Sequence, residues 1–255
     1  RYWRDWSSDV CSSDLKQFNG HSGSKVYLMK NNSHLFVRKV GNVERNYERL
    51  QALKNFPTPK IYNYVSGETL DMEYLHGLDI RNYLIHNNTS RLGDFIFFTL
   101  SEFGRTVTGY KDYTQTYYDK LQWLPDDFIF TKEELIGRLP KLLPRSTYHG
   151  DFTLENILYT NPGFHLIDPV TIEYDSYVFD IAKLRQDLVC KWFLRNHDTR
   201  LDVKLQVINN ELEEDYPLAC SNEMLILMLL RVLKHCEKND FNYQFLMKEI
   251  ERLWK

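Results

Sequence analysis

The residues best suited to chemistry lie in one short stretch of the chain. Asp151 is expected in a loop, Asn156 follows five residues later, and Asp168 comes twelve residues after that. Carboxylate and amide oxygens suit Mg²⁺, an ion that proteins usually hold with one or two side chains plus phosphates. A carboxylate beside such an ion can accept a proton from a hydroxyl group. The set therefore predicts phosphoryl transfer, with Asp151 as the base and Asn156 and Asp168 as the metal ligands.

The segment between Asn156 and Asp168 has the pattern of a β-hairpin. Residues 157–160 and 164–167 are the expected strands, and Asn161-Pro162-Gly163 is the turn. Because the two arms are equal in length, we expect Asn156 and Asp168 to face each other, with Cβ atoms roughly 5 Å apart. A lone aspartate in a loop is usually a solvated or capping residue, but the ordered spacing favours the catalytic interpretation.

Composition limits the class of protein. The chain has 255 residues, 43% of them hydrophobic and 15% aromatic, enough to bury the core of one large domain or of two lobes. The net charge of −3, with both signs interspersed, argues against non-specific binding to nucleic acid. The longest apolar run, Met224–Leu230, is too short to span a membrane. The four cysteines lack CxxC spacing, so we expect no zinc site, no disulfide framework and a cytoplasmic location.

The first fifteen residues differ from the rest of the chain. Residues 1–15 contain two tryptophans, a stuttered Ser-Ser-Asp sequence and no periodicity. The segment resembles the translation of a sequencing adapter fused to an open reading frame, and we exclude it as non-native. A genuine disordered tail is the alternative interpretation. On the first interpretation the native sequence begins near Lys16, and the first strand of the fold is truncated.

The next part of the chain predicts a small antiparallel sheet with one helix. Strands are expected at 25–30 and 34–40, joined by a tight turn, and again at 61–65 and 69–74. Between these two pairs, residues 43–56 have helical periodicity, and the prolines that follow end the helix.

From residue 76 onwards the pattern changes to helices. Ser90 is suited to cap a helix, and Thr131–Glu134 fits a capping box. The fold class is therefore α+β, with a small antiparallel β lobe carrying one helix at 16–75 and a larger α-rich lobe at 76–255. Further helical patterns follow the hairpin at about 176–195, 201–215, 221–237 and 241–254.

The small lobe carries two features that suit a nucleotide. Ser22, Gly23 and Ser24 lie just before a predicted strand, where small residues let backbone N–H groups approach phosphate oxygens; an ordinary turn is the alternative. Lys39 shares one strand face with Val37, and a lysine on an apolar face is costly unless it meets an anion. We interpret Lys39 as a phosphate contact and Val37 as a residue that lines adenine. An edge-strand lysine that prevents aggregation is the alternative.

Taken in order, these motifs resemble those of the aminoglycoside phosphotransferase and choline kinase superfamily, which has a protein-kinase-like two-lobe fold. The likeness covers residues 18 to about 195. The His-Gly-Asp and Leu-Ile-Asp-Pro sequences separate the chain from protein kinases, which carry His-Arg-Asp and Asp-Phe-Gly. The resemblance rests on the Gly/Ser segment, Lys39, the connector Met72–Gly77, His149-Gly150-Asp151 with Asn156, Ile167-Asp168, and Val178–Lys183.

The resemblance implies a role for each matching catalytic residue. Asp151 is implied to orient and deprotonate the hydroxyl of the acceptor. Asn156 and Asp168 are implied to hold Mg²⁺, and Lys39 the phosphates of ATP.

Four more residues take implied roles. Backbone groups of Glu73 and Leu75 are implied to bind adenine. His149 and Asp180 are implied to support the catalytic loop, although Asp180 also fits ordinary negative charge at a helix N-terminus.

One residue departs from the pattern of the superfamily. Its members carry a helix glutamate that pairs with the strand lysine, and here that register falls on Asn46, flanked by Glu44 and Glu48. Either a neighbouring glutamate reaches Lys39, or Asn46 makes a neutral hydrogen bond instead.

The acceptor side is suggested only by the loop at 171–177. Glu173 and Asp175 stand there beside two tyrosines. Carboxylates and aromatic faces suit an ammonium-bearing or polyhydroxyl acceptor. A solvated acidic loop is the alternative.

The leading hypothesis is ATP- and Mg²⁺-dependent transfer of the γ-phosphate to a hydroxyl of a small molecule, such as an amino alcohol, a sugar or an aminoglycoside-like compound. The alternative is a pseudokinase that binds nucleotide or acts as a scaffold, and Asn46 is the feature in its favour. Intact Asp151, Asn156 and Asp168 argue against that alternative. The absence of Asp-Phe-Gly and Ala-Pro-Glu sequences argues against a protein kinase.

Overall fold

The structure, a computed structural model, describes residues 16–18, 24–31, 34–161 and 163–255. These residues form two compact units, and each unit is made of two stretches of the chain. The sequence-based division at residue 76 differs from this one, because the hairpin that carries Asp168 belongs to the first unit. The interpretation of residues 1–15 concerns a segment outside the described residues. The first unit comprises the described residues of Arg1–Asn87 with Leu154–Ile172, and the second comprises Asn88–Thr153 with Glu173–Lys255.

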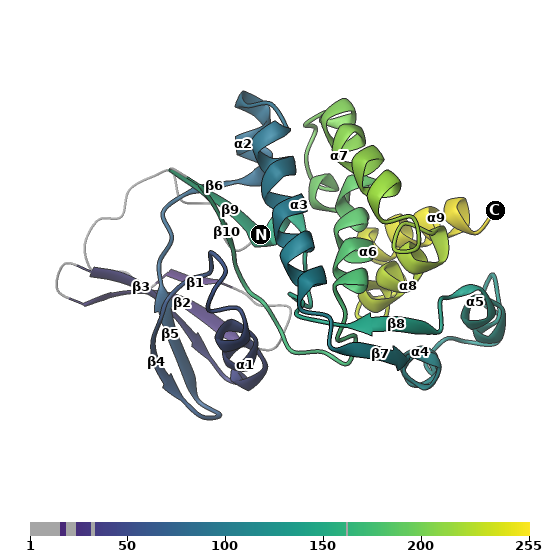
Figure 1. The fold of residues 1–255 in the computed structure, drawn as a ribbon, viewed down its shortest axis with the longest axis horizontal. Helices are drawn as coiled ribbons and strands as arrows, with labels where there is room; N and C mark the ends of the chain where they lie inside the picture. Colours follow the sequence, from purple (N-terminus) through teal and green to yellow (C-terminus); the bar gives the residue numbers. More distant parts are fainter. Residues whose placement is uncertain (1–15, 19–23, 32–33, 162) are drawn as a thin grey trace. The chain divides into compact units, whose positions relative to one another are not determined.

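A five-stranded antiparallel sheet dominates the first unit (Figure 1). Its strands are β1 Lys16–Phe18, β2 Lys25–Asn31, β3 His34–Val40, β4 Ile61–Val65 and β5 Thr69–Glu73. They lie in the order β1-β2-β3-β5-β4, and the predicted hairpins β2–β3 and β4–β5 are both confirmed. The three-residue strand β1 precedes the Gly/Ser segment and pairs with β2.

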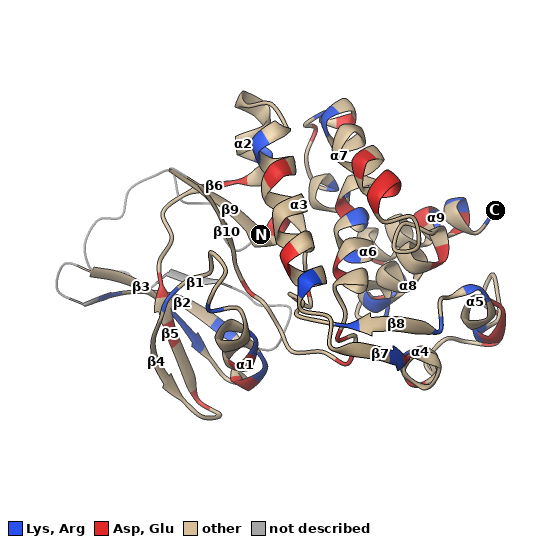
Figure 2. Ribbon diagram, viewed as in Figure 1, with Lys and Arg blue, Asp and Glu red and all other residues tan. Residues whose placement is uncertain are grey.

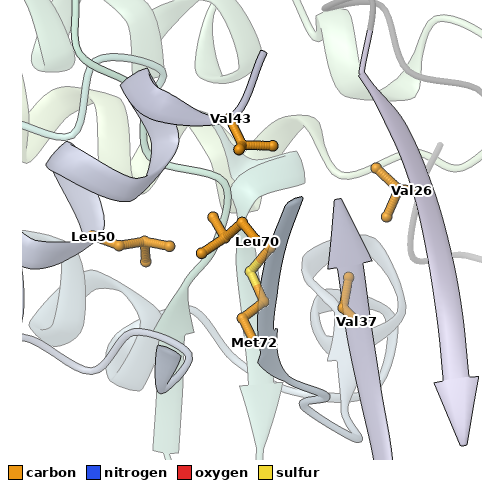
Figure 3. Close-up of a cluster of buried hydrophobic side chains, with 6 residues drawn as sticks. All are labelled: Val26, Val37, Val43, Leu50, Leu70 and Met72. Carbon is orange, nitrogen blue, oxygen red and sulfur yellow. The ribbon is translucent and has the colours of Figure 1, made fainter. Parts of the chain in front are cut away.

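One helix, α1 (Glu44–Ala52), packs on this sheet. We expected it to run from 43 to 56, but it ends at Ala52. The backbone N–H of Phe56 donates to the carbonyl oxygen of Leu53, which closes a turn ahead of the two prolines. Figure 3 shows the buried side chains of the cluster between helix and sheet: Val26, Val37, Val43, Leu50, Leu70 and Met72.

The rest of the first unit is a three-stranded sheet with a short helix. The strands are β6 Leu78–Asp79, β9 Ile157–Thr160 and β10 Gly163–Leu166, and the helix is α2 Ile80–His86. Strand β9 pairs with both β6 and β10. Leu158 and Ile167 pack against Leu75, so the hairpin shares a small core with the connector.

The register of this hairpin corrects the expected positions of the two metal ligands. Strand β10 begins at Gly163, which pairs with Thr160, so Gly163 belongs to the strand and not to the turn. Asn156 therefore lies opposite Ile167, whose N–H donates to the Asn156 carbonyl oxygen at 2.9 Å. The expectation that Asn156 and Asp168 face each other directly was wrong by one residue, because turn length sets the register.

The second unit is mostly helical (Figure 1). The predicted capping box is confirmed at Thr131 and Glu134. The helix expected at 176–195 ends at Leu188, and Lys191 then adopts a positive φ of 58° before a short 3₁₀ turn. The pairing of β7 with β8 was not anticipated. The elements are α3 Ser90–Arg105, β7 Gly109–Asp112, α4 Thr114–Leu121, α5 Lys132–Arg138, β8 Leu142–Arg145, α6 Tyr177–Leu188, α7 Asp202–Asp215, α8 Asn222–Leu233 and α9 Phe241–Trp254.

Charged residues of both signs are interspersed along the ribbon of each unit (Figure 2). Such mixing agrees with the small net charge of −3. Within the described ranges, no helix is both long enough and apolar enough to cross a membrane.

Gly77 lies where the first unit has no room for a side chain. A Cβ atom there would overlap the carbonyl oxygen of Tyr159 and lie 3.1 Å from Cγ2 of Thr160. We expect Gly77→Ala to lower the free energy of unfolding by about 1–3 kcal/mol, because backbone must move to admit the methyl group. Urea unfolding measures this change. The matched control is Gly163→Ala, where an added Cβ meets no described atom within 4 Å; an equal loss in both variants would contradict the prediction.

Candidate active site

Lys39 is a buried cation in the middle of the sheet of the first unit. It lies on β3 between its cross-strand partners, Val26 of β2 and Leu70 of β5. Lys39 is only 5% exposed, and an ammonium group in apolar surroundings is costly unless it is paired. Its Nζ forms an ion pair with Oδ1 of Asp168. The first unit thus brings two of the predicted site residues together.

Asp168 follows β10 and has an unusual backbone conformation. Its φ of 55° lies in the left-handed region, which aspartate tolerates better than most residues. Oδ1 accepts hydrogen bonds from Lys39 and, at 3.0 Å, from the side-chain amide of Asn46. Oδ2 has no partner among the residues that the structure describes, and the side chain is 37% exposed. One oxygen of this carboxylate is therefore available to a ligand.

Asn46 holds Asp168 rather than Lys39. Its amide nitrogen donates to Asp168 and, at 2.7 Å, to the carbonyl oxygen of Pro169. Glu44 accepts from the Ser66 hydroxyl at 3.1 Å. No described glutamate forms an ion pair with Lys39, which is paired with Asp168. Asn46 does make hydrogen bonds, as the second alternative expected, but to Asp168 and Pro169 rather than to Lys39.

Asn156 and Asp168 are the candidate metal ligands of the first unit, and their oxygen atoms suit an ion that also binds phosphates. Asn156 ends the short 3₁₀ turn before β9, and its backbone pairs with the residue before Asp168. Across the described part of the chain, no group of three His, Cys, Asp or Glu side chains is placed to hold a metal by itself. An amide oxygen and a single carboxylate oxygen instead suit Mg²⁺, which proteins bind through few side chains and substrate phosphates.

Of the residues predicted to contact the nucleotide near the glycine-serine segment, the structure describes Ser24 and Val37. Ser24 is buried, and its hydroxyl donates to the carbonyl oxygen of Asn42 at 3.2 Å. Val37 is 2% exposed and belongs to the core cluster between α1 and the sheet. Ser22 and Gly23 lie outside the described residues.

The predicted adenine contacts lie at the end of β5. The backbone N–H of Glu73 donates to the carbonyl oxygen of Lys60 at 2.8 Å. Leu75 is buried against Leu158 and Ile167. Both residues therefore belong to the unit that also contains Lys39.

Within the second unit, helix α6 holds the backbone of the predicted catalytic loop. The carboxylate of Asp180, on α6, accepts from the backbone N–H of His149 at 2.5 Å and of Gly150 at 2.8 Å. Gly150 has a φ of 89°, a conformation that glycine adopts without strain. His149 is fully buried, and its Nδ1 accepts from the N–H of Asp151 at 3.3 Å. These contacts place His149 and Asp180 where the sequence predicted structural support.

The Asp151 side chain is 38% exposed and faces a lysine that the sequence reading missed. Nζ of Lys183, on α6, lies 3.3 Å from Oδ1 of Asp151. Burial alone would raise the pKa of Asp151, but the positive charges of Lys183 and Arg231 outweigh it and hold that pKa below its ordinary value. The sequence spacing could have indicated this lysine. Lys183 follows Asp180 by three residues, which places it one helical turn further along the same side of the helix.

The two carboxylates expected to bind the acceptor are already paired. Asp175 accepts from Lys111 at 2.7 Å and from Arg145 at 2.8 Å. Glu173 forms an ion pair with Lys120 at 2.9 Å. The acidic loop is therefore neutralised within the second unit.

The fold is that of the protein-kinase-like phosphotransferases. The model of the phosphotransferase enzyme family (APH) matches residues 13–206, which is most of the chain. The chain belongs to this family. A comparison with curated protein sequences gives no match.

Solved structures with the same fold include three small-molecule kinases, all with low sequence identity. A thermostable mutant of aminoglycoside phosphotransferase APH(4)-Ia, in complex with ADP and hygromycin B, is 12% identical with a TM-score of 0.62, over 94% of this chain and 93% of that one. A putative fructosamine-3-kinase from Haemophilus somnus is 13% identical with a TM-score of 0.59, over 95% and 92%. Choline kinase LicA from Streptococcus pneumoniae is 13% identical with a TM-score of 0.55, over 94% of each chain.

Asn46 should stabilise the first unit through its two hydrogen bonds. We expect Asn46→Leu, which keeps the approximate shape, to lower the free energy of unfolding by about 1–3 kcal/mol, because the Pro169 carbonyl loses its donor in a buried position. Urea unfolding at neutral pH measures the loss. The control is Asn63→Leu on the exposed part of β4, where surface changes stay within about 0.5 kcal/mol. A change below that value for Asn46→Leu would show that its contacts do not matter.

Proposed function

We propose that the chain transfers the γ-phosphate of ATP to a hydroxyl group of a small molecule, in a reaction that depends on Mg²⁺. The observation that carries the proposal is the pair of half-exposed aspartates, each held by a buried lysine in its own unit. Asp168 has one carboxylate oxygen without a described partner, as a metal ligand needs. Asp151 keeps its negative charge, as a group that orients a hydroxyl and takes its proton needs.

The residues of the first unit would serve the nucleotide. Lys39 would contact the α- and β-phosphates, since its ammonium group is the buried cation of the sheet. Asp168 and Asn156 would hold Mg²⁺, which neutralises phosphate charge during transfer. Backbone groups at Glu73 and Leu75 would bind adenine. ADP in a complex of APH(4)-Ia, AMP-PNP in two others and AMP in a complex of LicA support a nucleotide substrate.

The residues of the second unit would serve the acceptor. Asp151 would accept a hydrogen bond from the reacting hydroxyl and then its proton, while the oxygen forms a bond to phosphorus and the bond to ADP breaks. Hygromycin B, fructosamine and choline in the names of the related structures support a small hydroxyl compound. Because Glu173 and Asp175 are already paired with basic side chains, we assign the acceptor to neither of them.

The pseudokinase alternative rested on Asn46. In the structure this residue is a donor to Asp168, so it supports the carboxylate that would bind the metal. The alternative therefore becomes one outcome of the test below, in which nucleotide binds without turnover.

Nucleotide binding should depend on Asp168. Mg²⁺-ATP at about 100 times its Kd should stabilise the native state by about 2.7 kcal/mol, which raises the thermal midpoint by roughly 5–10 °C. We expect this rise in the full chain and its loss in Asp168→Ala. The control is Asp127→Ala, an exposed aspartate that should keep the full rise. An unchanged rise of the thermal midpoint in Asp168→Ala would contradict the assignment of Asp168 as a metal ligand.

Turnover should depend on Asp151 while nucleotide binding does not. ADP release in the presence of amino alcohols, sugars and aminoglycosides identifies the acceptor. Asp151→Ala should then lower kcat by roughly 10²–10⁴-fold, the usual contribution of a positioned base, and should keep the thermal rise with Mg²⁺-ATP. If Asp151→Ala loses both equally, Asp151 is not the base; a thermal rise without turnover of any acceptor would favour the pseudokinase.

A further inference from the structure

Helix α6 carries a line of polar side chains in a buried setting. Asp180, Lys183 and Gln186 are spaced three residues apart, and they are 2%, 6% and 1% exposed. Every residue of α6 from Val178 to Leu188 is buried. A buried polar or charged group is costly unless it is paired. These three side chains therefore need hydrogen-bonding or charged partners, and the partners indicate the role of this side of α6.

The partners are consecutive residues of the catalytic loop. Asp180 accepts from the backbone N–H groups of His149 and Gly150. One turn further, Lys183 lies 3.3 Å from the carboxylate of Asp151. A single side of the helix thus holds the loop at three successive positions.

Gln186 completes the line by fixing the lysine. Its Oε1 accepts from Nζ of Lys183 at 3.2 Å. The ammonium group is therefore bound to an amide on one side and to Asp151 on the other. With 8% of its side chain exposed, Lys183 has little freedom to turn away from this position.

A second helix, α8, also contacts this loop. Arg231 donates to the carbonyl oxygen of Gly150 at 3.2 Å, and its guanidinium group lies 5.5 Å from the centre of the Tyr174 ring. Positively charged groups that act on Asp151 include Lys183 from α6, Arg231 from α8 and the neighbouring His149. All three favour the carboxylate form of Asp151 when positively charged.

We propose that Lys183 is a positioning residue for the reaction: it holds the carboxylate of Asp151 in one orientation and in its charged form. This inference rests on the proposed function of Asp151 and deepens it. Lys183 transfers no proton in this step. The acceptor oxygen forms its bond to phosphorus, the bond to the leaving nucleoside diphosphate breaks, and the acceptor proton moves to Asp151. Because the nearby ammonium opposes that last move, Asp151 takes the proton late and acts first by orienting the hydroxyl.

The first experiment measures the ionisation of Asp151 directly, without nucleotide or acceptor. The full chain is labelled with ¹³C at aspartate carboxyl groups and titrated by NMR, and Asp151→Asn assigns the signal. We expect the pKa of Asp151 to rise in Lys183→Met, where the charge is removed, and to stay near the parent value in Lys183→Arg. Lys248→Met, at an exposed position on α9, controls for the loss of a lysine elsewhere. An unchanged pKa in Lys183→Met would overturn the proposal.

A second variant keeps the proposal testable if Lys183→Met does not fold. Gln186→Glu preserves the shape of the side chain and adds a carboxylate that competes for the same ammonium. We expect it, too, to raise the pKa of Asp151. A lowered or unchanged value would show that Lys183 does not act on Asp151.

The kinetic test separates this proposal from the proposed function. Once an acceptor is known, Lys183→Met should lower kcat by about 10²-fold, the effect of a slightly misplaced catalytic group. KM for ATP should change less than threefold, and the acid limb of the kcat profile should move to higher pH. Lys183→Arg should recover part of kcat. Equal changes in kcat and KM would indicate a structural role and overturn the proposal. If no acceptor reacts, the proposed function fails, and the NMR titration still decides whether Lys183 controls Asp151.

Discussion

One constraint recurs in both units: a lysine that folding buries must keep an anion beside it. The side chains of Lys39 and Lys183 are 7% and 8% exposed, whereas the aspartates that they hold, Asp168 and Asp151, are 37% and 38% exposed. An ammonium group in a buried setting is costly unless an anion lies beside it. Each loop aspartate is thus fixed by a rigid strand or helix on its protein side and remains partly open on the other. Such an arrangement suits groups that must meet a ligand in a set orientation.

Sequence reasoning reached one of these lysines and missed the other for a physical reason. Lys39 stands out because alternation along a strand separates a buried face from an exposed one. Helix α6 is buried on every side, so its periodicity offers no such contrast, and the partner of Lys183 comes much earlier in the chain. The hairpin before Asp168 was predictable from its turn residues, but its register depended on whether Gly163 belonged to the turn or to the strand. The pairing of β7 with β8 was missed because their residues are far apart in sequence.

The acceptor is the part of the function that local composition describes least well. Two carboxylates and two tyrosines in one loop suggested a site for a cation. In the folded second unit, however, Asp175 lies between Lys111 and Arg145, and Glu173 pairs with Lys120. The charge that a ligand meets depends on neighbours from other segments. The fold supports phosphotransfer, but a shared fold does not specify the compound that receives the phosphate.

The first unit is discontinuous in sequence, and this affects how the chain can reach its native state. As the chain leaves the ribosome, the sheet with Lys39 appears early, but β9, β10 and Asp168 follow only after all of Asn88–Thr153. Until then, the burial of Lys39 lacks its counter-charge and β6 lacks β9. Joining the two stretches of the first unit closes a loop that includes Asn88–Thr153, which costs conformational entropy. The pair at Lys39 can therefore form only after Asp168 has been made, so the ammonium is neutralised only when both stretches of the first unit are present.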